Sequence, residues 1–260
     1  MRNGLKEKLR RGEVAVGCWV TTPSLDVTRI LAYAGFDWLV FDMEHAPLTM
    51  QDVQKLIAVV DPDRITPMVR VASNDPVVIK LALDVGAYGV IIPHVDSREE
   101  AVKAVKACKY PPKGIRGVGP RYPSMYGAEF GEYVSTADDE ILMLIMIEHI
   151  DAVNRIDEIL SVPDLEGFFV GPADLSASMG LLNEACNYPP SAKVQEAMAK
   201  VRETGKRHGV IAGTWAGSVD SANEYIAQGY RFIALAQDTD YLHRARQDLE
   251  KIARNPRSHH

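Results

Sequence analysis

The strongest constraint on the fold is a regular alternation of short apolar runs with amphipathic segments along the whole chain. Several runs are apolar throughout, which is typical of parallel strands buried on both faces. The segments between them have helical spacing, and some begin with a capping Ser, Thr or Asp. We therefore expect helices at 24–35, 49–60, 75–86 and 97–110, among others. We expect eight strands, at 15–21, 37–43, 65–71, 88–94, 141–147, 167–171, 210–216 and 231–237.

Eight strand-and-helix units in a chain of 260 residues match the size and rhythm of a TIM (β/α)8 barrel. A doubly wound open sheet is the alternative, but no GxGxxG motif follows the first strand. We therefore predict an α/β fold with a single TIM-barrel domain over residues 1–260. The stretch 111–140 is the longest without a clear element, and its tyrosines favour a subunit contact or a site lid about equally with an ordinary surface loop.

Composition and charge disfavour several function classes. The formal net charge is −6, and no Lys/Arg run stands beside aromatic residues, so we expect no nucleic-acid partner. The apolar runs are far shorter than the ~20 residues of a membrane span, and no signal-peptide core follows the charged start, so we expect a cytoplasmic protein without a membrane partner. We interpret the scattered Cys18, Cys108 and Cys186 as buried thiols, and residues 258–260 as a purification-tag remnant.

Reactive residues of a TIM barrel lie where its strands end, because the loops that follow the strands meet at one rim. The expected strand ends carry a set of polar and aromatic side chains. These are Glu44, His45, Arg70, His94, Glu148, Asp174 and Trp215.

Each of these residues also has a purely structural interpretation. Asp174 could cap a helix, and Glu148 could be an acid in the first turn of a helix. Arg70 could belong to a structural ion pair, and His45 could be a satisfied histidine above the core. We assign His94 and Trp215 mainly to packing. The conjunction of two acids, one Arg and one His on the same face favours a functional site.

Two carboxylates on consecutive strands, with no thiolate near them, suit a hard divalent cation such as Mg²⁺ or Mn²⁺, with Co²⁺ as an alternative. A 2-oxo acid can chelate such a cation, and Arg70 would balance its charge. The cation and Arg70 would then stabilise an enolate, which is worth several kcal/mol. His45 is the natural proton carrier. No lysine ends a strand, so a Schiff-base route is the weaker interpretation.

At these residues the sequence resembles the HpcH/HpaI family of metal-dependent class II pyruvate aldolases. The resemblance spans most of the chain. It lies in the stretches "GFDWLVFDMEHAP", "MVRV", "LDVGAYGVIIPHV", "YPPKGIRGVGP", "IEH" and "GPADLSASMG".

The resemblance implies a divalent metal held by Glu148 and Asp174, with the substrate carboxylate near the backbone amides of Ala173 and Asp174. It implies that Arg70 stabilises the enolate and that His45 is the base, made more basic by Asp84. Asp84 precedes the fourth strand, where we expect the opposite rim, so either a neighbouring subunit supplies it or it is a surface acid. The resemblance also implies a homohexamer built as a trimer of dimers.

The chain departs from the family pattern at two places. Met146 stands where the family usually has Gln, and a thioether cannot donate the hydrogen bond of an amide. In "RYPSMYG", Tyr122 and Met125 replace two arginines of the family motif, so the substrate preference is expected to be atypical.

The sequence therefore predicts a Mg²⁺- or Mn²⁺-dependent aldolase that reversibly cleaves a 4-hydroxy-2-oxo acid into pyruvate and an aldehyde. Three alternatives remain: a lyase acting on an acyl-CoA, a decarboxylase of an oxaloacetate-like acid, and a 2-oxo-acid-binding protein without turnover.

Overall fold

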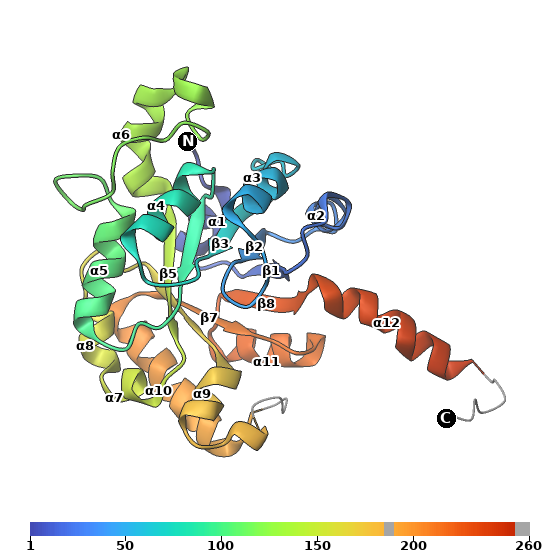
Figure 1. The fold of residues 1–260 in the computed structure, drawn as a ribbon. Helices are drawn as coiled ribbons and strands as arrows, with labels where there is room; N and C mark the ends of the chain where they lie inside the picture. The colour runs from blue at the N-terminus through green and yellow to red at the C-terminus, as the bar shows by residue number, and fades with distance from the viewer. Residues whose placement is uncertain (185–189, 253–260) are drawn as a thin grey trace.

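The computed structural model describes residues 1–184 and 190–252 of the chain. Its eight strands are all parallel and form a closed barrel in the order β1 to β8, so the predicted TIM barrel is confirmed (Figure 1). The strands are β1 (Ala15–Val20), β2 (Trp38–Asp42), β3 (Thr66–Arg70), β4 (Gly89–Ile92), β5 (Leu142–Ile147), β6 (Gly167–Val170), β7 (Ile211–Trp215) and β8 (Phe232–Gln237).

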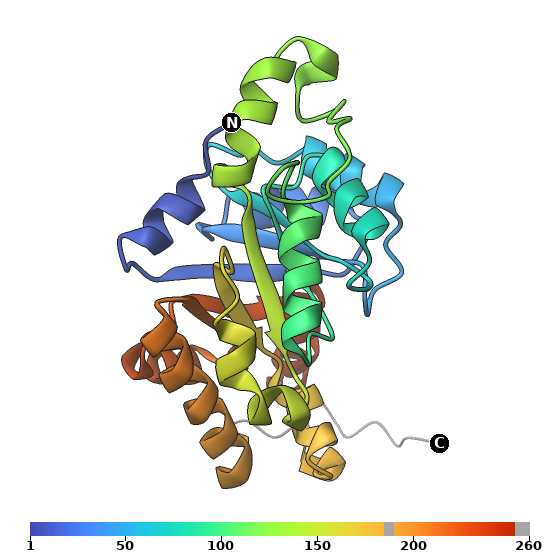
Figure 2. The same ribbon diagram turned by 90° about the vertical axis from the view of Figure 1, so that its left-hand side faces the viewer.

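Helices connect successive strands and lie outside the barrel (Figures 1 and 2). The four helices expected in the first half of the chain each begin after a residue whose side chain accepts from the first turn, namely Ser24, Thr49, Asp75 and Ser97. The α-helices are α1 (Gly4–Arg10), α2 (Leu25–Ala32), α3 (Met50–Ala58), α4 (Pro76–Asp84), α5 (Arg98–Cys108), α6 (Phe130–Glu140), α7 (Ile150–Asn154), α8 (Ile156–Leu160), α9 (Pro172–Ser178), α10 (Ala192–His208), α11 (Val219–Gln228) and α12 (Asp238–Lys251). Two short 3-10 helices span Met125–Gly127 and Leu182–Glu184.

The strands are buried on both faces, which explains their uninterrupted apolar sequences. In β5, Leu142, Leu144 and Met146 belong to the cluster inside the barrel, whereas the residues between them pack outward against the helices. The period of two follows from the pleat of a strand. The helix α1 closes the amino-terminal end, where Leu5 and Leu9 join the inner cluster. Beside them the buried Lys6 pairs with Glu166.

The stretch 111–140 is not free of regular structure, because α6 occupies its second half. Its sequence has no side chain that caps the start, and only Tyr133 and Ala137 are buried in it, so the helical pattern is weak. The stretch lies at the amino-terminal rim of the barrel, where Tyr122 and Tyr126 line a cavity of about 360 Å³. The hypothesis that this stretch forms a lid over the site of its own chain is therefore wrong. Its role in a subunit contact stays a prediction.

Cys18 and Cys108 are buried free thiols, as predicted, whereas Cys186 and residues 258–260 lie outside the described part of the chain. Among the described residues no helix is long and apolar enough to cross a bilayer.

The barrel interior has no room for a side chain at Gly17. A Cβ built there would lie 1.9 Å from the ring of Trp38, which is itself stacked on Phe232 with a 4.1 Å separation of ring centroids. We predict that Gly17→Ala lowers the free energy of unfolding by about 1–3 kcal/mol, the usual cost of overpacking. Urea denaturation measures it. Gly131→Ala, at an open position of α6, is the control and should stabilise by roughly 0.5–1 kcal/mol. Equal losses in both variants would contradict the prediction.

Candidate active site

A buried arginine lies at the carboxyl-terminal rim, where β2 and β3 end side by side. Asp42 and Arg70 are paired in the strand register. Arg70 Nε donates to Asp42 Oδ1 at 2.8 Å and Nη2 donates to Oδ2 at 2.7 Å, which is a bidentate ion pair. The guanidinium carbon lies 4.3 Å from the ring centroid of Trp19, so the ring stacks on the cation. The pair and the ring fix the position of the positive charge.

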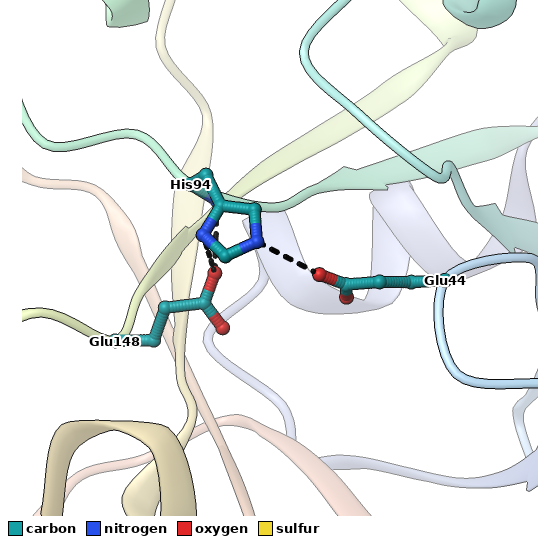
Figure 3. A group of neighbouring side chains, drawn as sticks. All are labelled: Glu44, His94 and Glu148. Carbon is teal, nitrogen blue, oxygen red and sulfur yellow. Dashed lines mark hydrogen bonds and ion pairs between the residues drawn. The ribbon is translucent and has the colours of Figure 1, made fainter. Parts of the chain in front are cut away.

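A second group of side chains lies at the same rim and joins Glu44, His94 and Glu148 (Figure 3). The backbone N–H of His94 donates to Glu148 Oε1 at 2.8 Å. The imidazole lies between the two carboxylates, with Nε2 3.3 Å from Glu44 Oε1 and Nδ1 3.5 Å from Glu148 Oε1. One ligand atom from each residue lies within 4.8 Å of the others. The three residues could hold a metal ion together.

The two glutamates carry buried negative charge. Burial raises the pKa of Glu148 above its usual value, and the nearby charges of Glu44 and Asp174 add to the effect. Burial likewise raises the pKa of Glu44, against the opposing effect of Arg70. Glu44 Oε2 lies 3.1 Å from Arg70 Nη1 but makes no hydrogen bond of good geometry. A cation bound at this rim would compensate the buried negative charge of both glutamates.

A cavity of about 210 Å³ opens beside these groups, at the carboxyl-terminal ends of the strands. It is smaller than the 300–1,000 Å³ of pockets for drug-sized ligands, so it suits a small substrate. Its lining combines the Asp42–Arg70 pair with aromatic rings and the start of α9. The lining residues are Trp19, Asp42, Arg70, Met146, Phe169, Gly171, Pro172, Ala173, Asp174, Trp215 and Gln237.

The structure places most of the predicted site residues at this rim. Arg70, Ala173 and Asp174 line the cavity, and Glu148 lies in the neighbouring acidic cluster. The imidazole of His45 is largely exposed and its Nε2 lies 3.9 Å from Glu44 Oε2, so it is not a satisfied histidine of the core. Their catalytic and metal-binding roles stay predictions.

Two structural interpretations of the acids are wrong. Asp174 is not the cap of α9, because that position is Gly171 and Asp174 lies inside the first turn. Glu148 is not in the first turn of α7 either, since it precedes the capping residue His149. The interpretation of Arg70 as an ion-pair partner is correct, and the pair itself lies in the site.

Asp84 ends α4, which leads into the amino-terminal end of β4, so it lies at the rim opposite His45. It accepts from Arg116 Nη2 at 2.7 Å, and the same nitrogen lies 3.1 Å from the hydroxyl oxygen of Tyr133. A His45–Asp84 pair within one chain is therefore wrong. A contribution of Asp84 to the site of a neighbouring subunit stays a prediction.

Sequence reasoning missed part of the site. His94 is exposed and paired with two glutamates, so its assignment to packing is wrong. Its φ of 54° is unusual for a residue with a side chain and aims the backbone N–H at Glu148. The sequence assigns no role to Asp42 and identifies Glu44 only as a polar residue at a strand end. Their position at the end of β2 was the available signal.

The closed barrel, with a buried arginine and an acidic cluster at its carboxyl rim, places this chain among the TIM-barrel enzymes. Comparison with known proteins narrows the class. A model of the HpcH/HpaI aldolase/citrate lyase family matches residues 15–245, and the chain belongs to this family. It is accordingly a carbon–carbon lyase of the aldolase kind.

Several relatives match almost the whole chain. The 4-hydroxy-2-oxo-heptane-1,7-dioate aldolase of Escherichia coli is 37% identical over 250 residues, which are 96% of this chain and 94% of the relative. The hydroxypyruvate/pyruvate aldolase of Roseovarius nubinhibens is 36% identical over 253 residues, 96% of each chain. A family member of known structure from Burkholderia cenocepacia J2315 superposes with a TM-score of 0.88 at 35% identity, covering 96% of this chain and 98% of that one.

The buried ion pair of the site is expected to stabilise the fold. We predict that Asp42→Ala lowers the free energy of unfolding by about 3–5 kcal/mol, because it leaves the Arg70 charge buried without its main partner. Urea denaturation checks the value. Glu250→Ala, which removes the partner of Arg246 in an exposed pair, should cost less than about 1 kcal/mol. A loss at Asp42 as small as that at Glu250 would show that the pair is not structurally important.

Proposed function

We propose that this protein is a divalent-metal-dependent aldolase that reversibly cleaves a 4-hydroxy-2-oxo acid into pyruvate and an aldehyde. The observation that carries the proposal is the position of the buried Glu148 beside further carboxylates, at the same rim as Arg70 and Asp174. The relatives named 4-hydroxy-2-oxo acid aldolases support the substrate class.

The residues at this rim fit a hard divalent cation. Their donors are mainly carboxylate oxygens, which Mg²⁺ and Mn²⁺ prefer, and no thiolate lies among the residues that the structure describes there. Glu44 Oε2, which accepts no hydrogen bond of good geometry, and the raised pKa values of Glu44 and Glu148 point the same way. In our proposal Glu148 and Asp174 hold the cation, and Glu44 is the rival for the second position. A cation bound there would supply Lewis-acid stabilisation of the developing negative charge.

The protein's own groups would bind and orient the 2-oxo acid. The carboxylate of the substrate would accept hydrogen bonds from the backbone amides of Ala173 and Asp174. No side chain caps the start of α9, so no cap competes for these amides. Arg70 would face the 2-oxo group, and Asp42 would hold its guanidinium in place.

In the cleavage direction His45 would take the proton of the C4 hydroxyl. The C3–C4 bond then breaks, its electron pair moves toward the C2 oxygen, and C4 leaves as the aldehyde. Arg70 stabilises the enolate oxygen until C3 is protonated to give pyruvate. His45 is well placed for proton exchange with solvent because its side chain is 62% exposed.

We also propose that the protein is a homo-oligomer, as a hexamer built from dimers, in which a neighbouring subunit supplies Asp84. The helix α12 supports an assembly, because it projects away from the barrel and buries only Asp238 (Figure 1). Leu242, Leu249 and Ile252 are each at least half exposed. A single helix of this length is marginally stable in water unless its apolar face is packed.

The metal site is tested by Glu148→Gln. We expect kcat/KM for cleavage to fall more than a hundredfold, the equivalent of several kcal/mol of lost stabilisation. MgCl₂ or MnCl₂ should raise the melting temperature of the unmodified protein and not of the variant, since binding to the folded state stabilises it. Pyruvate release and thermal unfolding are the two measurements.

The matched control is Glu203→Gln at an exposed position of α10, which should keep both properties. Asp174→Asn should remove the cation-dependent stabilisation, and Glu44→Gln should retain most of it. The reverse result would assign the second ligand to Glu44. Pyruvate release that survives both EDTA and Glu148→Gln would exclude a metal-dependent reaction, and release of CO₂ from oxaloacetate alone would favour a decarboxylase.

The assembly is tested by Leu249→Asp. Light scattering coupled to gel filtration should give about six times the chain mass for the unmodified protein and a smaller assembly for the variant, because a charge would be buried in the contact. Gln247→Asp, two residues away on the same helix, is the control for added charge and should leave the mass unchanged. A monomeric unmodified protein would contradict the proposal.

A further inference from the structure

The charged groups around the cavity are already engaged with one another. Of the described residues that line it, Arg70 alone is cationic, and both Asp42 oxygens accept from it while Glu44 lies 3.1 Å from its third nitrogen. The carboxylates of Glu44, Glu148 and Asp174 add negative charge at the rim. Among the described residues of a single subunit, a second anionic group on a substrate would therefore find no unengaged cationic side chain in this cavity, but several like charges.

The rest of the cavity wall is aromatic and apolar. The ring of Trp19 lies edge-on to Phe169, with centroids 5.7 Å apart, and tilted against Trp215, with centroids 6.4 Å apart. Met146 continues this wall, with its sulfur 3.9 Å from Arg70 Nη1. These contacts hold the rings in place, so the wall offers a preformed apolar surface.

Two polar groups belong to this wall. The Nε1 atom of Trp19 is fully buried and has no hydrogen-bond partner, so it does not reach the cavity surface. The side chain of Gln237 interacts with Asp240 at the start of α12, which leaves it a neutral amide on the wall. Both are uncharged. The aromatic wall can therefore accept a neutral oxygen of a ligand beside its carbon skeleton, but it offers no charge to bind an anion.

We infer that the aldehyde partner is uncharged and carries an apolar or aromatic substituent, and that Trp215 and Met146 determine this specificity. The inference rests on the proposed function. The 2-oxo-acid head would be bound by Arg70 and by the amides of Ala173 and Asp174, which lie on the polar side of the cavity. The aldehyde carbon forms its bond to C3 of pyruvate, so its substituent must occupy the remaining space beside that head. In this cavity that space is bounded by Trp19, Phe169, Trp215 and Met146.

The test compares aldehydes in the condensation direction with pyruvate as donor. We expect a kcat/KM for benzaldehyde at least about tenfold above that for succinic semialdehyde, which carries a distal carboxylate. Trp215→Ala should lower the value for benzaldehyde about tenfold and that for acetaldehyde less than about twofold, because only the larger substituent reaches the ring. Tyr33→Ala, at an exposed aromatic residue just after α2, is the control and should change neither value.

The donor is tested separately, so that the two proposals fail in different ways. Exchange of the methyl protons of pyruvate in D₂O, measured by NMR without any aldehyde, reports enolate formation alone. Normal exchange together with a preference for succinic semialdehyde would overturn the inference and leave the proposed function intact. A Trp215→Ala effect on 2-oxobutanoate as donor, with unchanged aldehyde preference, would also overturn it. Absence of exchange in the metal-loaded protein would overturn both proposals.

Discussion

Burial of every strand on both faces is the constraint on which the site depends. A polar side chain within a strand would have to be buried without water, at a cost of several kcal/mol unless it is paired. The chain therefore keeps its strands apolar and places polar groups where the strands end. Closure of the barrel brings these ends together, so Asp42 and Arg70, which end β2 and β3, meet Glu148, which follows β5, at one rim.

The Asp42–Arg70 pair links this scaffold to the chemistry. Because two adjacent strands end in register, the carboxylate and the guanidinium meet without any loop rearrangement. Arg70 is thereby held with little freedom, and the charge it offers to an enolate needs no reorganisation during the reaction. The acidic cluster differs from this pair, because its residues follow the strands and it carries an excess of carboxylates. His94 and Glu44 follow the ends of their strands, and the exposed imidazole lies between two carboxylates. In our proposal the bound cation adds the missing positive charge at that side.

The fold was predictable because each strand is a short apolar run, and the helices after the first four strands begin at capping side chains. The strand positions agree to within a residue or two at either end. The helix α6 was not predicted from the sequence, because its start has no side-chain cap and its apolar positions are few. For the site, strand ends located Arg70, Glu148 and Asp174 at the correct rim. They did not show that His94 turns its N–H toward Glu148, because this depends on a positive φ that a histidine rarely adopts. The sequence pattern also placed Asp84 at the opposite rim, and the structure agrees.

Asp238 has a consequence for how the chain folds. It begins α12 just after β8, and its buried carboxylate accepts hydrogen bonds from Thr21 and Thr22, which follow β1. These hydrogen bonds therefore connect the end of the first strand to the end of the last strand. During synthesis β1 emerges from the ribosome long before its neighbour β8 has been made. Until then, one edge of β1 has no partner strand. The barrel can close only once β8, at residues 232–237, has left the exit tunnel.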